Sequence, residues 1–107
     1  MITTHVLDTT RGRPAAGIPV TLAFQVSEHE WTSLGEDVTD ADGRARSLTP
    51  PGTKLTKGSY RLIFDVKSYE PGFYPSVILV FHVDAPDEHY HVPLLLSRFG
   101  YTTYRGS

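Results

Sequence analysis

Histidines near both ends of the chain are the residues best suited to chemistry. His89 and His91 stand two positions apart near the C-terminus, and His5 stands near the N-terminus. On a strand, side chains at positions i and i+2 point to the same face, so His89 and His91 would face one way together. A neutral imidazole can bind a metal ion or remove a proton from water near neutral pH. The pattern therefore indicates either a metal site or an acid–base site.

Three interpretations of these histidines remain open. The three imidazoles are a possible ligand set for zinc, although no carboxylate is obviously placed to accept a hydrogen bond from their other ring nitrogens. Metal-free hydrolysis is the second interpretation, and it needs a fixed cation for the developing oxyanion, which Arg44, Arg46 or Arg105 could supply. The third is a set of solvated histidines on the surface of a sheet. Spacing alone does not decide among them.

The last four residues are of unusual types for a chain end. They are Tyr104, Arg105, Gly106 and Ser107. Terminal residues usually fray and tolerate change, so an aromatic ring, a cation, a glycine and a hydroxyl in these positions suggest a terminus that is tied into a site.

The elements that must position these residues are strands. Apolar residues recur with period two along residues 18–26, 60–66, 77–83 and 90–96, which is typical of strands with one buried face. Further short strands are expected at 3–8, 31–38 and 101–105, with turn-forming clusters between them. No segment has a long 3.6-residue period. We therefore predict an all-β, antiparallel Greek-key sandwich of seven to eight strands with little or no helix, as a single domain over residues 1–107.

Alternation along the strands also predicts which side chains share a face. If the apolar residues of 90–96 face the core, His91 faces outward. Val6 is expected in the core, which turns His5 to the opposite face, and the same reasoning places Tyr104 away from the core. Three strands would then present His5, His91 and Tyr104 on one outer surface. A fold of this size has little room for a deep cleft, so we expect the site to lie between subunits.

Composition excludes several classes of partner. Ten Lys and Arg against twelve Asp and Glu give a formal net charge of -2 without a basic block, so we expect no nucleic acid partner. The absence of cysteine excludes disulfides, thiolate zinc sites and a cysteine nucleophile. No stretch approaches the roughly 20 apolar residues of a membrane-spanning helix. We therefore expect no membrane partner and a cytoplasmic protein.

Four stretches that together cover nearly the whole chain resemble the transthyretin-related 5-hydroxyisourate hydrolases. They read THVLDTTRGRPAAGIPV at 4–20, TDADGRAR at 39–46, GSYRLIFDV at 58–66 and HYHVPLLLSRFGYTTYRGS at 89–107. The closing YRGS is the most specific of these motifs, because transthyretin itself, a hormone carrier with the same sandwich, lacks it. The resemblance implies a transthyretin-like fold.

The resemblance also implies a reaction and an assembly. The reaction is the metal-independent, cofactor-free hydrolysis of 5-hydroxyisourate to 2-oxo-4-hydroxy-4-carboxy-5-ureidoimidazoline in urate degradation. The assembly is a homotetramer, a dimer of dimers, whose sites line a channel between dimers, with the small substrate as the other partner. The alternative is a non-catalytic small-molecule carrier of transthyretin type that uses the same channel.

The family's functional residues map onto matching residues of this sequence. The catalytic positions fall on His5, Arg44, His91 and Ser107, and the substrate-binding positions fall on Tyr104, Arg105 and Gly106. The resemblance does not say which histidine is the general base. One stretch departs from the family: residues 67–76, KSYEPGFYPS, form a shortened segment in which a proline and a glycine disfavour a helix. We expect a loop or a single turn there.

Overall fold

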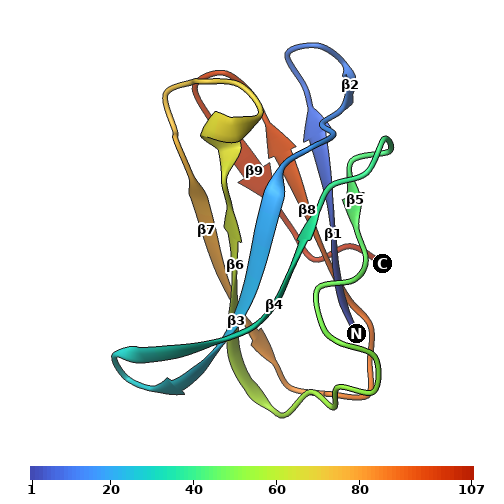
Figure 1. The fold of residues 1–107 in the computed structure, drawn as a ribbon, viewed down its shortest axis with the longest axis vertical. Coiled ribbons are helices and arrows are strands. Elements are labelled where there is room, and N and C mark those ends of the chain that lie inside the picture. The colour runs from blue at the N-terminus through green and yellow to red at the C-terminus, as the bar shows by residue number, and fades with distance from the viewer.

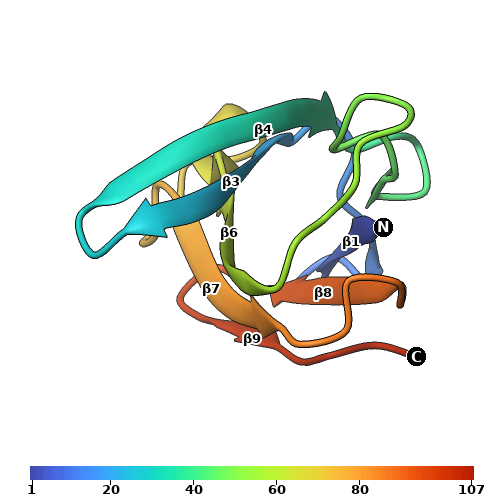
Figure 2. The ribbon, with the colours of Figure 1, turned by 90° about the horizontal axis from the view of Figure 1, so that it is seen from below.

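Two β-sheets pack face to face in a computed structural model that describes residues 1–107 (Figures 1 and 2). The elements are β1 (Ile2–Asp8), β2 (Arg13–Pro14), β3 (Pro19–Ser27), β4 (Glu30–Val38), β5 (Arg44–Ala45), β6 (Gly58–Phe64), the 3₁₀ turn η1 (Val66–Ser68), β7 (Val77–Val83), β8 (Tyr90–Leu96) and β9 (Tyr101–Thr103). One sheet has the order β2-β1-β8-β9, with β5 also paired to β1, and the other has the order β4-β3-β6-β7. None of the helices is long and apolar enough to cross a membrane.

The core lies between the two sheets and is built from the alternating apolar residues. The largest fully buried side chains include Tyr60, Phe64, Ile2, Ile18, Leu22, Leu48, Leu62 and Leu94. Burying a side chain such as that of Leu or Phe stabilises a fold by about 1.5 to 3 kcal/mol. Alternate residues are buried along much of β6 and β7, and the predicted all-β sandwich is confirmed.

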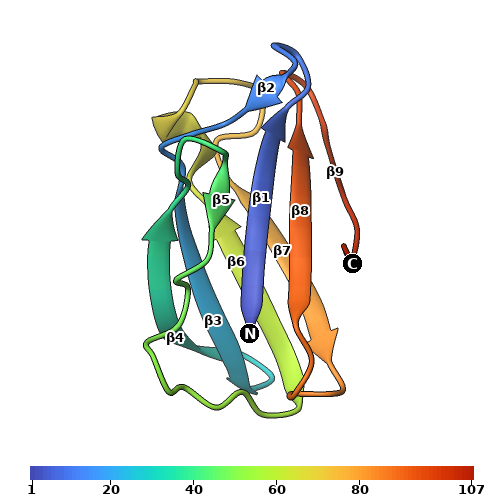
Figure 3. The same cartoon turned by 90° about the vertical axis from the view of Figure 1, so that its right-hand side faces the viewer.

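One strand pair runs parallel, which the alternation pattern does not reveal. β1 pairs with β8 in parallel along its whole length, from Ile2 opposite Tyr90 to Asp8 opposite Leu96. Figure 3 shows the two strands side by side with their arrows in the same direction. β9 then pairs antiparallel with β8. The structure also adds the two-residue strands β2 and β5 to those that the sequence predicts.

Val26 does not belong to the core, although it continues the alternation of residues 18–26. Its side chain is 52% exposed. β3 pairs with β6 only from Val20 to Phe24, and beyond this point β3 and β4 continue as a two-stranded ribbon that projects from the sandwich (Figure 1). A register shift between Gln25 and Ser27 accompanies this exit. Val26 therefore lacks an opposing sheet to pack against.

Residues 67–76 contain no helix beyond the end of the single turn η1, which begins at Val66, and this agrees with the loop or single turn that the sequence predicts. Polar contacts hold this turn to the end of β1. Tyr69 donates a hydrogen bond of 2.7 Å to Oδ2 of Asp8, whose side chain is only 6% exposed. Arg11 donates its backbone N–H to the same carboxylate at 3.0 Å and forms an ion pair of 2.6 Å with Glu70. Burial raises the pKa of Asp8, but the bonds from Tyr69 and Arg11 outweigh burial and lower it overall.

Replacing Tyr69 with Phe should destabilise the fold in a pH-dependent way, because it leaves the buried Asp8 carboxylate one hydrogen bond short. We expect the free energy of unfolding at pH 7 to fall by about 1.5 to 3 kcal/mol. The stabilisation from a lowered carboxyl pKa is present above the unfolded-state value and is lost as pH falls through the folded-state value. The difference between wild type and Tyr69→Phe should therefore shrink in acid.

Denaturant unfolding at pH 7 and at pH 3 measures this effect. Tyr74→Phe is the matched control, because the Tyr74 hydroxyl makes no hydrogen bond within the chain and its side chain is partly exposed. Equal unfolding midpoints for Tyr69→Phe and Tyr74→Phe would show that the contact with Asp8 contributes nothing.

Candidate active site

The parallel pairing of β1 with β8 brings histidines from the two ends of the chain together. Thr3 is opposite His91, and His5 is opposite Pro93. The ring centroids of His5 and His91 are 6.5 Å apart, and those of His89 and His91 are 6.2 Å apart. All three imidazoles therefore lie on the outward face of the five-stranded sheet, as strand alternation predicts.

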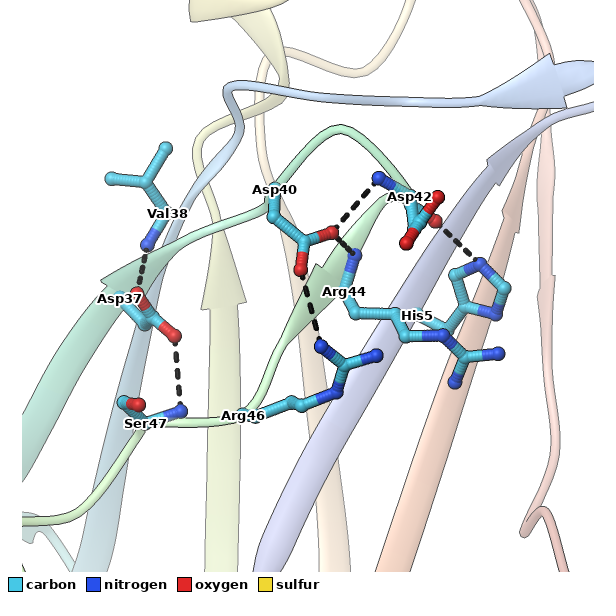
Figure 4. A network of polar contacts seen from close by, with 8 residues as sticks. All are labelled: His5, Asp37, Val38, Asp40, Asp42, Arg44, Arg46 and Ser47. Carbon is cyan, nitrogen blue, oxygen red and sulfur yellow. Dashed lines mark hydrogen bonds and ion pairs between the residues drawn. The ribbon is translucent and has the colours of Figure 1, made fainter.

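A turn before β5 adds Arg44 to this face. Asp40 organises the turn, because its Oδ1 accepts hydrogen bonds from the backbone N–H of Asp42 at 2.9 Å and of Arg44 at 3.0 Å (Figure 4). Gly43 has a φ of +78°, and a Cβ atom there would clash with the backbone carbonyl of Val6. β5 then pairs with β1 so that Arg44 lies opposite His5.

The same turn orients the ring of His5. Nε2 of His5 lies 2.7 Å from the backbone carbonyl oxygen of Asp42 (Figure 4). A carbonyl oxygen can only accept a hydrogen bond, so Nε2 of His5 carries the proton. In the neutral ring Nδ1 of His5 then keeps a free lone pair.

Arg44 differs from the other two candidate arginines in its partners. Arg46 forms an ion pair with Asp40 at 3.4 Å, and Arg105 forms one with Glu88 at 3.0 Å. The guanidinium of Arg44 has no ion pair within the chain, and Figure 4 shows its side chain extending from the turn toward the side of His5. Arg44 is thus the cation that is free to bind an anion or a polar ligand at this face.

The surroundings of His91 favour its neutral form. Burial lowers the pKa of His91 below the ordinary histidine value, and the nearby positive charge of Arg44 lowers it further. Nδ1 of His91 is engaged with the hydroxyl of Thr3 at 2.8 Å. The opposite ring nitrogen, Nε2, makes no hydrogen bond within the chain. When its proton is on Nδ1, the neutral imidazole of His91 has a free lone pair on Nε2 and can accept a proton from water there.

The chain end is paired back onto β8 beside His91. The backbone N–H of Gly106 donates to the carbonyl of His91 at 2.8 Å. A Cβ atom on Gly106 would lie only 2.7 Å from Cδ2 of His91 and 3.3 Å from Cγ of Pro93, so only glycine permits this approach without displacement. Ser107 follows directly and is exposed.

Tyr104 and Arg105 lie on the side of this terminal segment that faces β7. Both line a cavity of about 430 Å³ between β7 and β8, together with Tyr90 and Val80. The guanidinium of Arg105 also stacks 4.2 Å from the centroid of the Tyr90 ring. β9 ends at Thr103, so strand alternation does not extend to Tyr104 and the expectation that it shares the face of the histidines is not met within one chain.

Thr3 is the site residue that the sequence reasoning passed over. Thr3 and His5 are two positions apart on β1 and so share a face, but only the register between β1 and β8 places the Thr3 hydroxyl between His89 and His91, at 2.7 Å and 2.8 Å. Nε2 of His89 and Nδ1 of His91 are both engaged with that hydroxyl, so these two nitrogens do not share a separate position for a metal ion. No group of three or more His, Cys, Asp or Glu residues is arranged to hold a metal ion.

Comparison with known proteins adds a family and named relatives. A family model described as HIUase/Transthyretin family matches residues 2–106. The chain is 42% identical to the 5-hydroxyisourate hydrolase of Salmonella typhimurium, over 112 residues that cover 100% of this chain and 81% of that protein. It is 30% identical to the Klebsiella pneumoniae 5-hydroxyisourate hydrolase, with a TM-score of 0.80 and coverage of 99% and 97%. The transthyretin of Sparus aurata is also 30% identical, with a TM-score of 0.87 and coverage of 98% and 95%.

Replacing Gly106 with Ala should release the terminal residues from β8, because the added methyl group overlaps the ring of His91. We expect amide hydrogen exchange at residue 106 to become at least tenfold faster, since a loss of about 1.4 kcal/mol corresponds to a factor of ten. Gly100→Ala is the matched control, because a Cβ atom there comes no closer than 3.7 Å to a neighbour. Unchanged protection at residue 106 would mean that the terminal pairing accommodates a side chain.

Proposed function

Because the chain belongs to the HIUase/Transthyretin family, we propose that His5, Arg44 and His91 form the active site at which it hydrolyses 5-hydroxyisourate. The product is 2-oxo-4-hydroxy-4-carboxy-5-ureidoimidazoline, and the reaction belongs to urate degradation. The observation that carries this proposal is that Arg44, which has no ion-pair partner, lies opposite His5 in the strand register and close enough to His91 for its charge to lower the pKa of that imidazole. Neither a metal nor a cofactor is required for the steps below.

His91 acts as the general base in this mechanism. Water adds to a ring carbonyl carbon of the substrate, and its proton passes to Nε2 of His91. Burial supports this role because the lowered pKa keeps His91 neutral, and therefore able to accept a proton, at neutral pH. Since the pKa is below the ordinary value of 6.5, the midpoint of the activity loss that comes from protonating His91 should lie below pH 6.5.

His5 orients the attacking water, and the leaving nitrogen takes its proton from His91. Its bond to the carbonyl of Asp42 fixes the ring and leaves Nδ1 facing away from that partner. In this position Nδ1 accepts a hydrogen bond from the attacking water and orients it. When the carbon–nitrogen bond breaks, the leaving nitrogen takes a proton from the imidazolium formed during attack, so that one water is consumed and no proton is gained or lost on the enzyme.

Arg44 stabilises the negative charge that forms on the carbonyl oxygen. A guanidinium presents several N–H donors in one plane, which suits the oxyanion and the polar edge of a purine-derived ring. The turn organised by Asp40 supports this role, because it fixes the backbone of Arg44 while Arg46 takes the remaining carboxylate oxygen. The charge on Arg44 therefore remains available for the substrate.

The terminal residues bind the substrate at the edge of the site. Gly106 allows the chain to run against His91, and this supports a role for the next residue, Ser107, at the site. Ser107 hydrogen-bonds the substrate or the water there. Tyr104 and Arg105 face the β7 side of the segment and shape the substrate's approach from that edge.

The working assembly is a homotetramer, a dimer of dimers. Two edge strands, β7 and β9, have no neighbour on their outer side in one chain, and Ile78 and Val80 on β7 are 51% and 61% exposed. Exposed apolar edge strands are natural positions for pairing with a second chain. The histidine face is an open sheet surface, so a second dimer placed against it would supply the walls of a channel.

The single most direct test is the decay of 5-hydroxyisourate itself. Urate oxidase converts urate to this unstable compound, and its ultraviolet absorbance should fall faster when the protein is added. His91→Asn should lower the turnover rate by roughly 100-fold or more, because it removes the general base. His29→Asn is the control, since the side chain of His29 is 88% exposed in the β3–β4 turn. A chelator should have no effect.

A negative result would favour the carrier alternative. If micromolar protein binds the compound without accelerating its decay, the hydrolase proposal is wrong and the family resemblance reflects a transthyretin-type carrier. If His91→Asn retains full turnover, the site assignment fails although the activity stands.

The assembly is tested by light scattering. We expect a particle of four times the 11.9 kDa of one chain. Val80→Lys should shift the population toward smaller species, because it places a charge on the exposed apolar edge of β7. Val26→Lys is the matched control on the projecting β3–β4 ribbon, where a similarly exposed valine lies away from that edge. A stable, fully active monomer would contradict the proposed channel.

A further inference from the structure

The hydroxyl of Thr3 lies between two imidazole rings. Oγ1 of Thr3 is 2.7 Å from Nε2 of His89 and 2.8 Å from Nδ1 of His91. Thr3 is 5% exposed, and the register of β1 against β8 places it directly opposite His91. The three groups thus form a continuous hydrogen-bonded chain, one end of which is the proposed general base.

Proton counting limits this chain to two arrangements when both histidines are neutral. A hydroxyl has one proton to donate, and each neutral imidazole carries one N–H. The Thr3 hydroxyl makes no other hydrogen bond within the chain, and leaving a buried O–H unpaired costs about 1 to 3 kcal/mol. Thr3 therefore donates to one ring and accepts from the other.

The two arrangements give His91 opposite abilities. In the first, Nδ1–H of His91 donates to Thr3, Thr3 donates to Nε2 of His89, and Nε2 of His91 has a free lone pair. In the second, Nε2–H of His89 donates to Thr3, and Thr3 donates to Nδ1 of His91. The proton of His91 then sits on Nε2, which cannot accept another. Only the first arrangement allows His91 to act as a base at its free nitrogen.

We propose that Thr3 and His89 are positioning residues that set the tautomer of His91. The proposal rests on the general-base role assigned to His91 above. The first arrangement also accommodates the protonated ring, because Nδ1–H keeps donating to Thr3 after Nε2 has taken the proton from water. The relay therefore needs no rearrangement during the proton transfer, and its fixed hydrogen bonds orient the ring as well.

Protonation of His89 reverses the relay. An imidazolium carries a proton on both nitrogens, so a charged His89 can only donate to Thr3. Thr3 must then donate to Nδ1 of His91, which puts the His91 proton on Nε2. His89 is thus a switch that removes the base from His91 in acid without touching the substrate.

Other charged groups surround this relay. Arg44 on β5 and His5 on β1 face His91. On the side of His89, Glu88 is neutralised by Arg105 from the terminal segment. The charged groups at the relay are therefore Arg44 and His5 at its His91 end, and the ion pair of Glu88 with Arg105 at its His89 end.

Two pairs of variants test the relay. Thr3→Val keeps the shape and removes the hydroxyl, and Thr3→Ser keeps the hydroxyl. We expect Thr3→Val to lower kcat at least tenfold with little change in KM, and Thr3→Ser to restore most of it. His89→Gln places a carbonyl that can accept from Thr3 and cannot ionise, so activity at pH 7.5 should persist while the acid limb loses one ionisation. His89→Phe removes the acceptor and should lower kcat.

Nitrogen NMR of the imidazole rings provides a readout that does not depend on turnover. At pH 7.5 the wild-type ring of His91 should carry its proton on Nδ1, and in His89→Phe the proton should move to Nε2. His29→Gln is the control for the loss of a histidine. An unchanged His91 tautomer and unchanged kcat in Thr3→Val would overturn the relay. Full turnover by His91→Asn would instead overturn the general-base role, so the two failures are distinguishable.

Discussion

The parallel pairing of β1 with β8 is the constraint on which the site depends. Its register sets Thr3 against His91 and leaves His5 one step further along the same face. Neither strand carries the site alone, because each supplies only part of the imidazole group. β5 joins through its own pairing with β1 and adds Arg44. The side chains of His5, Arg44 and His91 are thus held by backbone ladders, which restrict their movement more than loops would.

The positions of most strands, and the face that each of them buries, can be predicted from the sequence. Period-two alternation identified the strands and the buried face of each, and a proline and glycine limited residues 67–76 to a single turn. Alternation does not predict the orientation or the register of strand pairs, because it is the same in parallel and antiparallel pairs. Val26 marks another limit: alternation continues past the point where the opposing sheet ends.

Strand alternation predicts the face of those site residues that lie on regular strands, and it predicts nothing for the others. Parity placed His5 and His91 on one face, but it could not separate Arg44 from Arg46 and Arg105. That choice depends on which arginines form ion pairs. Arg46 pairs with Asp40 and Arg105 pairs with Glu88 in the folded chain, and sequence spacing does not predict these contacts. The contacts of Thr3 with His89 and His91 could not be predicted either, because they depend on the register between β1 and β8.

The distance along the chain between the two halves of the site has a consequence for folding. Thr3 and His91 are separated by 88 positions, so their meeting closes almost the largest loop that the domain allows. Such non-local pairings are entropically costly to form and make folding slow. During synthesis β1 leaves the ribosome long before its partner β8 exists, and it must wait without that neighbour. A partly made or partly folded chain therefore lacks a complete site, and the chemistry begins only when β8 has paired with β1.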